Sequence, residues 1–174
     1  PSSYTFNFPQ PTTGTVQVAW SASHGIRDLA PVPNNFAGGN WSYVLDPNAA
    51  EPDVIITEFM AGNTRTIVDE DGDFPDWIEI YNTGSIAVNL NGWSLTDDRN
   101  NLTKWTFPAT NIPGGSFMII FASEEDRRVP GRPLHTNFRL SSGGEYLALV
   151  KPDGAIASAY SPTYPPQVDD VSAR

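Results

Sequence analysis

Proline and glycine recur along almost the whole chain, and their spacing constrains the fold more than any other feature. The 174 residues include 16 prolines and 14 glycines, and the longest stretches free of both are 93–107 and 116–129. Proline removes a helical hydrogen bond, and glycine weakens the interior of a helix. Residues 93–107 are rich in Trp, Thr and Asn, which favour strands and turns. We therefore expect no long helix.

The segments between these residues have the length and pattern of short strands. Eight are predicted, over residues 53–60, 76–82, 87–96, 104–108, 116–122, 136–140, 145–151 and 155–160. Asn91-Gly92 interrupts the third as a turn or bulge, and residues 116–122 are apolar on both faces, as in a central strand. Strands at this spacing with no helices between them indicate a β-sandwich or barrel.

Two expectations concern local structure and the core. Residues 123–128 (SEEDRR) begin with a candidate N-cap serine and carry acids in the first turn, so we expect one or two turns of helix there. Trp93, Trp105 and Phe107 are predicted to be core residues.

Residues 1–50 differ from the rest. They hold three predicted strands, at 4–8, 16–20 and 41–45, followed by a segment at 46–52 with the composition of a linker. Three strands are too few for an ordinary independent core. They either extend the sheet of the main domain or are the end of a preceding domain. The chain begins at Pro1 and not at Met, so we expect a mature form or an excised piece.

The charge is concentrated in the middle of the chain. The formal net charge is −10, and residues 51–126 supply 14 acids against three bases. This excess excludes a nucleic-acid-binding surface, which needs basic residues. The chain has no cysteine, which excludes disulfides and thiolate chemistry, and no run of 18 apolar residues that predicts membrane insertion.

Several motifs carry a resemblance to a known family. They are ITEFMAGN at 56–63, DWIEIYN at 76–82, VNLNGWSLTDD at 88–98, WTFP at 105–108, IPGG at 112–115, NFRL at 137–140, GEYLAL at 144–149, YPPQ at 164–167 and DVS at 170–172. In order and spacing they resemble the lamin-tail domain in its bacterial form. The N-terminal motifs GIRD at 25–28 and FAGGNW at 36–41 are similar to the last strands of bacterial Ig-like repeats.

The resemblance implies an all-β, Ig-like β-sandwich without catalytic activity. It divides the chain into residues 1–50, as the C-terminal strands of a preceding Ig-like domain plus a linker, and residues 51–174, as a lamin-tail domain with a C-terminal tail. Bacterial domains of this kind look like modules of large secreted or surface proteins, which implies an extracellular location. The chromatin contacts of nuclear lamins do not carry over, because the middle segment is acidic.

An acidic loop is the strongest candidate for a metal site. Carboxylates at Asp69, Asp71, Asp73 and Asp76 surround Gly72 just before a predicted strand. Ca²⁺ takes six to eight oxygen ligands from flexible loops, so this set predicts a calcium site. The glycine position and the missing Glu at position 12 exclude an EF-hand. The alternative is a solvated acidic loop with no cofactor.

A second candidate lies on the strand that follows. Trp77, Glu79 and Tyr81 share one face of residues 76–82, and amphipathic aromatic side chains dominate contact surfaces. This stripe either binds a protein or sugar or is covered by neighbouring segments.

Other side chains are weaker candidates for catalytic groups. Glu58 and Glu79 with the acidic loop are a weak candidate for a glycosidase pair, because no motif supports it. His24 and His135 lack a nucleophile motif and are expected to be structural or exposed.

The sequence thus predicts a non-catalytic extracellular module for adhesion, spacing or docking, which contacts a protein or carbohydrate surface. The alternative is a carbohydrate-binding or Ca²⁺-stabilised accessory module of a secreted hydrolase. Unpaired sheet edges also predict a weak homodimer through strand addition.

Overall fold

The computed structural model describes residues 13–21, 23, 25–27, 30–33, 39–45 and 54–174. The chain divides into two compact units, residues 1–51 and 52–174, which we call the hairpin unit and the sandwich unit. The predicted strand at 4–8, His24 and the linker at 46–52 lie outside the described residues. Within the described part of the chain, no helix has the length and hydropathy needed to cross a membrane.

The described residues of the hairpin unit form one antiparallel pair of strands. β1 (Gly14–Ala19) pairs with β2 (Asn40–Leu45) along its whole length. Val16 and Val18 share one face of β1 and are partly buried, whereas the other residues of the strand are exposed. The strands predicted at 16–20 and 41–45 are therefore present. That they are the end of a preceding Ig-like domain stays a prediction.

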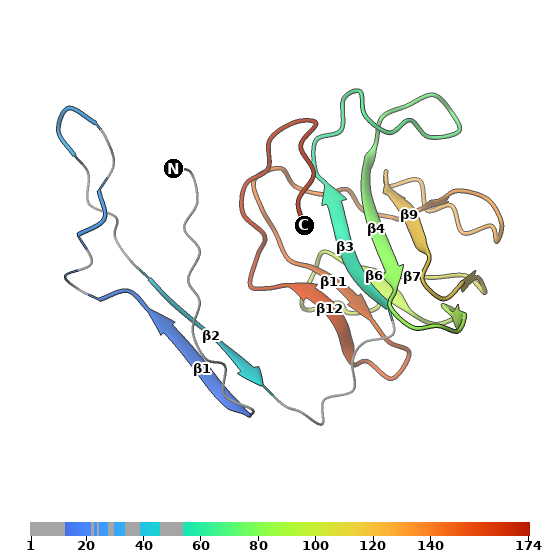
Figure 1. Ribbon diagram of the computed structural model, residues 1–174. Helices are drawn as coiled ribbons and strands as arrows, with labels where there is room; N and C mark the ends of the chain where they lie inside the picture. Colours follow the sequence, from blue (N-terminus) through green and yellow to red (C-terminus); the bar gives the residue numbers. More distant parts are fainter. Residues whose placement is uncertain (1–12, 22, 24, 28–29, 34–38, 46–53) are drawn as a thin grey trace. The chain divides into compact units, whose positions relative to one another are not determined.

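The sandwich unit is built from two four-stranded sheets (Figure 1). The first has the order β10-β9-β4-β3 and the second the order β12-β11-β6-β7, with a small β5-β8 pair beside them. The strands are β3 (Val54–Met60), β4 (Asp76–Asn82), β5 (Val88–Asn89), β6 (Ser94–Thr96), β7 (Trp105–Thr106), β8 (Asn111–Ile112), β9 (Phe117–Ala122), β10 (Leu134–His135), β11 (Leu147–Val150) and β12 (Ile156–Tyr160). The predicted all-β sandwich is confirmed.

The inward-facing residues of both sheets form one hydrophobic core. β4 contributes Ile78 and Ile80, as the alternation predicts, and both are fully buried. The predicted core residues Trp93, Trp105 and Phe107 are also buried in it. Burying such side chains is the main stabilising contribution to a sandwich of this kind.

The C-terminal segment closes the edge of the first sheet. Ala173 exchanges backbone hydrogen bonds of 3.0 and 2.8 Å with Phe59 of β3. Glu58 accepts hydrogen bonds from Ser172 and Arg174 of the same segment. Part of the β3 edge is therefore occupied by the chain itself.

The prediction of a helix at residues 123–128 is wrong. Glu124 and Asp126 have φ values of 70° and 54°, in the left-handed region that a right-handed helix excludes. Backbone groups here bond across to the next strand: the Asp126 N–H donates to the Thr136 carbonyl, and the Arg127 carbonyl accepts from His135. These tertiary hydrogen bonds replace the local ones that a helix would make.

The prediction of a strand at residues 136–140 is also wrong. The strand there is β10, which ends at His135 and pairs in parallel with β9. The Thr136 hydroxyl donates to the carbonyl of Phe138, and this local turn takes the chain out of the sheet. The N–H of Leu140 then donates to the carboxylate of Asp76.

Candidate functional site

The acidic loop after residue 68 is an ordered turn that its own hydrogen bonds hold in place. The Oδ1 atom of Asp69 accepts the N–H groups of Asp71 and Asp73 at 3.0 and 2.9 Å, and the Asp69 N–H donates to the Asp73 carbonyl. Gly72 has a φ of +89°, which a glycine adopts without strain. The sequence folds this way because an aspartate side chain readily accepts a hydrogen bond from the backbone N–H two residues further along the chain.

The four predicted aspartates have different roles in the structure. Asp71 forms an ion pair with Arg127. Asp76 accepts N–H groups from Gly62, Asn63 and Leu140, which leaves its carboxylate largely satisfied by the backbone. The structure therefore does not gather the four carboxylates around one point.

Three of these aspartates do border a common cavity of about 300 Å³. Its polar lining includes Asp69, Asp73, Asp76, Ser123, Glu125 and Arg139. The cavity joins the acidic loop to the segment that follows β9. It has room for several water molecules or for a hydrated ion.

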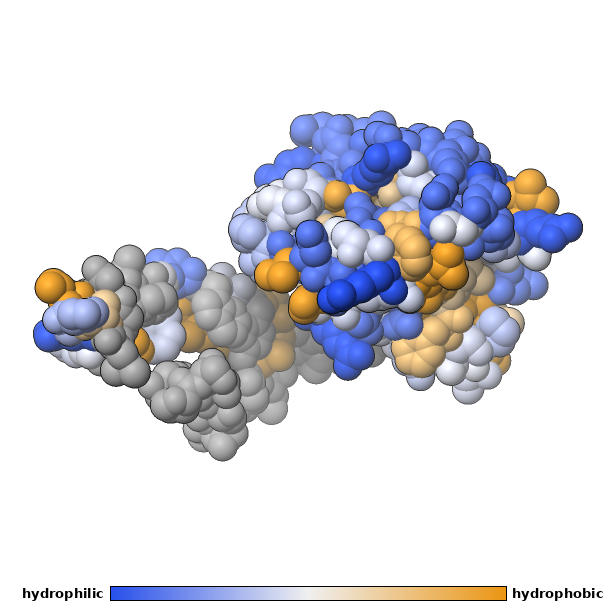
Figure 2. All heavy atoms as spheres, turned by 90° about the horizontal axis from the view of Figure 1, so that it is seen from above, coloured by the Kyte–Doolittle hydropathy of each residue, from blue (hydrophilic) through white to orange (hydrophobic). Residues whose placement is uncertain are grey.

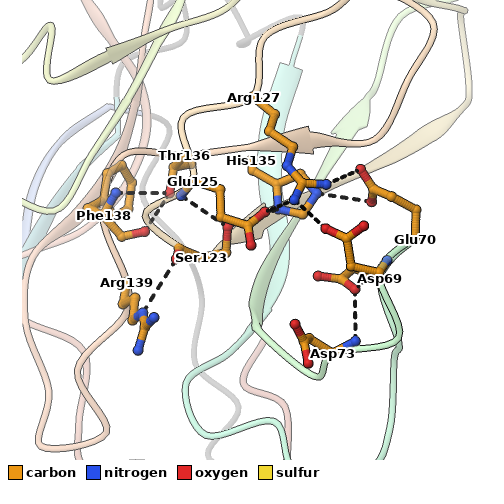
Figure 3. Close-up of polar contacts among 11 residues, drawn as sticks. Asp69, Glu70, Asp73, Ser123, Glu125, Arg127, His135, Thr136, Phe138 and Arg139 are labelled. Atoms are coloured by element: carbon orange, nitrogen blue, oxygen red, sulfur yellow. Dashed lines mark hydrogen bonds and ion pairs between the residues drawn. The ribbon is translucent and has the colours of Figure 1, made fainter.

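One group of metal-ligating side chains meets beside this cavity. Among the described residues, Asp69, Glu125 and His135 alone form a set of three whose ligand atoms all lie within 4.8 Å of one another. His135 is fully buried and Asp69 is 8 % exposed. Figure 3 shows the three side chains directed toward one another from the acidic loop, the segment after β9, and β10.

Each side chain of the group has a defined set of neighbours. His135 Nδ1 lies 2.9 Å from the Ser123 hydroxyl and 3.2 Å from Glu125 Oε2. Its Nε2 atom lies 3.1 Å from Glu70 Oε2. The second oxygen of Asp69, Oδ2, is buried and has no hydrogen-bond partner.

Arg127 is the main cation of this site. Its guanidinium contacts the carboxylates of Glu70, Asp71 and Glu125. The hydrogen bonds that Arg127 donates to Asp71 and Glu70 raise the pKa of Arg127 further above its ordinary value. Burial acts to raise the pKa of Glu70, but hydrogen bonds from its own N–H, His135 and Arg127 outweigh burial and hold this pKa below its usual range.

Ser123, His135 and Glu70 also form a hydrogen-bonded chain of the kind found in serine hydrolases. In a serine hydrolase, the histidine Nε2 atom contacts the serine and Nδ1 contacts the carboxylate. Here the roles of the two His135 nitrogens are reversed, because Ser123 contacts Nδ1 and Glu70 contacts Nε2. Glu125 approaches the same Nδ1 atom as the serine. A carboxylate there opposes the negative charge that an acyl-transfer intermediate develops, so the arrangement is poor for nucleophilic catalysis.

The predicted stripe on β4 is divided into a covered end and an open end. Trp77 is 5 % exposed and packs with Met60 and Phe121, under Ile67 from the loop between β3 and β4. Tyr81 is partly exposed and stacks on Phe117 of β9, with ring centroids 4.4 Å apart and planes inclined by 28°. Phe117 is 59 % exposed.

Glu79 of the stripe and Glu58, the two carboxylates of the candidate glycosidase pair, both have structural partners. Glu79 accepts a hydrogen bond of 2.8 Å from the hydroxyl of Thr57 on β3. Glu58 lies opposite Glu79 beside a bulge and is held by the C-terminal segment. Neither carboxylate lines the cavity by the acidic loop.

The model of the lamin tail domain family matches residues 47–163, more than half of the chain. The chain belongs to this family. The Ig-like sandwich that the sequence predicts is therefore confirmed for the lamin-tail unit, the name used below for residues 52–174. No curated protein sequence matches the chain closely enough to count as a relative.

Sequence reasoning found Asp69 but missed Glu125 and His135 as its neighbours. Glu125 lay in a segment that was predicted to be helical, and His135 lay in an apolar context with no local motif. The parallel pairing of β10 with β9 brings His135 beside the loop after β9. Only a prediction of that pairing could have grouped these residues.

Proposed function

We propose that the lamin-tail unit is a non-catalytic docking module of a larger secreted or surface protein, and that it contacts a protein partner. The proposed contact surface is the open end of the outer sheet face, centred on Tyr81 and Phe117. Membership of a family whose members serve as interaction modules supports a docking role. The extracellular location is part of the proposal.

The stacked pair of Tyr81 and Phe117 carries the proposal. The two residues lie directly opposite each other on β4 and β9, and Phe117 exposes more than half of its surface. A solvent-exposed phenylalanine on a sheet face stabilises a monomer little, but it is a strong anchor in an interface. Figure 2 shows, on the face it presents, that hydrophilic side chains dominate the lamin-tail unit but leave apolar patches open.

The ring geometry favours a protein over a carbohydrate as the ligand. Tyr81 and Phe117 stack on each other, so one face of each ring is already in use. Sugar binding through aromatic residues relies on a free, flat ring face, whereas a protein side chain packs equally well against ring edges. A carbohydrate-binding accessory module remains the alternative function.

Binding to arrayed ligands tests this proposal. The labelled full chain, as wild type, Phe117→Ser and Val168→Ser, is applied to an array of secreted and surface proteins and to a glycan array. Val168 is 68 % exposed and serves as the matched apolar control. We expect binding to specific proteins that Phe117→Ser reduces at least tenfold and Val168→Ser leaves unchanged. Binding to glycans alone, or equal binding by all three chains, would contradict it.

The absence of catalysis is tested separately at the Ser123–His135–Glu70 chain. We expect the full chain to hydrolyse an activated ester such as p-nitrophenyl acetate no faster than the Ser123→Ala variant does. A rate that falls at least a hundredfold on this substitution would overturn the non-catalytic assignment.

A further inference from the structure

We propose that Asp69, Glu125 and His135 bind a divalent transition-metal ion, with Zn²⁺ as the best-fitting representative. The site joins the acidic loop, the segment after β9, and β10. It differs from the predicted calcium site in two of its three ligands and in the metal it favours. It does not depend on the proposed docking surface, which involves other residues.

The first argument is the unsatisfied oxygen of Asp69. Oδ1 of this carboxylate caps the loop, but Oδ2 is buried without a partner in a side chain that is 8 % exposed. A buried carboxylate oxygen without a hydrogen bond or counter-ion destabilises the folded state. A cation between Asp69, Glu125 and His135 would remove that cost.

The second argument is charge. Arg127 is paired with the carboxylates of Glu70, Asp71 and Glu125. Asp69 adds a fourth carboxylate beside them, which gives the cluster a net charge of −3 when His135 is neutral. Arg139 lines the cavity, but it pairs with Glu124. The cluster therefore still attracts a cation.

The third argument is the orientation of the imidazole. Nε2 of His135 lies 3.1 Å from Glu70, and a carboxylate in this position holds the Nε2–H tautomer, which leaves Nδ1 unprotonated. The Ser123 hydroxyl 2.9 Å from Nδ1 would then donate to this lone pair, and it would have to rotate away for a metal to bind there. Nδ1 lies 3.2 Å from Glu125 Oε2. Two atoms bound to one tetrahedral zinc at about 2.0 Å lie about 3.3 Å apart, so this pair is already close to the required spacing.

The ligand types select the metal. An imidazole nitrogen with two carboxylates suits Zn²⁺ or a similar transition metal, whereas Ca²⁺ and Mg²⁺ prefer oxygen ligands alone. The adjacent cavity leaves room for a water molecule as the fourth ligand. In a chain without cysteine, such an ion would cross-link three segments that no disulfide can join.

Titration of the full chain with ZnCl₂ at pH 7, in a buffer that does not chelate metals, tests the site by calorimetry and thermal unfolding. We expect one Zn²⁺ per chain, a preference of at least tenfold over Ca²⁺, and a Tm higher by about 5 °C at a hundredfold excess over Kd. Asp69→Asn keeps the capping oxygen, and Glu125→Gln changes a partly exposed side chain, so both variants are expected to fold. Each should weaken Zn²⁺ binding at least tenfold.

Two controls exclude other zinc ligands. Glu124→Gln removes the neighbouring carboxylate, which pairs with Arg139, and His24→Gln removes the second histidine. Both should bind Zn²⁺ as the wild type does, and zinc should shift the Nδ1 NMR signal of His135. The proposal is overturned if Zn²⁺ gives no heat and no rise in Tm, or if either control weakens binding as much as Glu125→Gln. Binding of Ca²⁺ alone, lost in Asp73→Asn, would also overturn it and support the four-aspartate calcium site.

Discussion

The two ends of the outer face of β4 have the same pattern in the sequence but opposite environments in the structure. At one end, Trp77 lies under the loop between β3 and β4 and joins a second small hydrophobic cluster. At the other end, Tyr81 stacks on the exposed ring of Phe117. Alternation along a strand determines which side chains share a face, but a separate segment determines which of them are covered.

The covering loop is held by polar side chains and not by its own packing alone. Asn63 donates to the carbonyls of Ile67 and Pro75 and accepts from Thr66, which closes the loop on itself. Asp170 of the C-terminal segment accepts the N–H groups of Thr64 and Arg65. Among the described residues of the lamin-tail unit, no corresponding segment covers Phe117, whose side chain is 59 % exposed.

The largest effect is expected from Trp77→Ala. Removing the buried indole should lower the free energy of unfolding by about 3–5 kcal/mol, because it leaves a cavity beneath the loop. Phe117→Ala at the open end should cost no more than about 1 kcal/mol, because its ring is already exposed. Urea unfolding of both variants measures the difference. Equal losses would show that the two ends are covered alike.

A smaller loss is expected from Asn63→Ala. This substitution leaves partly buried backbone groups of the covering loop without the partners that Asn63 provides, and should destabilise the chain by about 2 kcal/mol. Asn100→Ala, which changes an exposed asparagine, is the matched control and should have little effect. If proteolysis between β3 and β4 does not accelerate in Asn63→Ala, the loop is not held by this side chain.

The smallest effect, and the only pH-dependent one, is expected from Asp170→Asn. The hydroxyl and N–H of Thr64, followed by Arg65, hold the pKa of Asp170 below its ordinary value of 3.8. The carboxylate therefore stabilises the folded state above that value, and this contribution is lost as the pH falls through the lower folded-state pKa. Asparagine tolerates the φ of 60° at this position, so the variant mainly removes the charge.

The Asp170→Asn prediction is checked by urea unfolding at several pH values. The variant should be less stable than the wild type at pH 7, and the difference should shrink as the pH falls below 3.8. Asp169→Asn, at the exposed neighbouring carboxylate, should show neither effect. A difference that is constant with pH would show that the charge of Asp170 does not anchor the loop.

Local patterns predicted the acidic loop but not the site that it forms. Asp69 and Asp76 lie at the two ends of the same acidic run, yet Asp69 keeps an unpartnered oxygen while Asp76 is satisfied by backbone N–H groups. Both outcomes depend on residues far away in the sequence. The run SEEDRR was predicted to be helical because local capping rules favour it, and those rules ignore hydrogen bonds to another strand.

The sequence by itself determined the β-sandwich class, most strand positions, the family and the concentration of negative charge. These follow from short-range properties, namely the period of apolar residues and the turns that proline and glycine enforce. Only the tertiary structure decided that Trp77 is covered and Phe117 open, and that Asp69 meets Glu125 and His135. Such contacts join segments separated by long intervening chain, and their pairing depends on sheet topology, which local patterns do not encode.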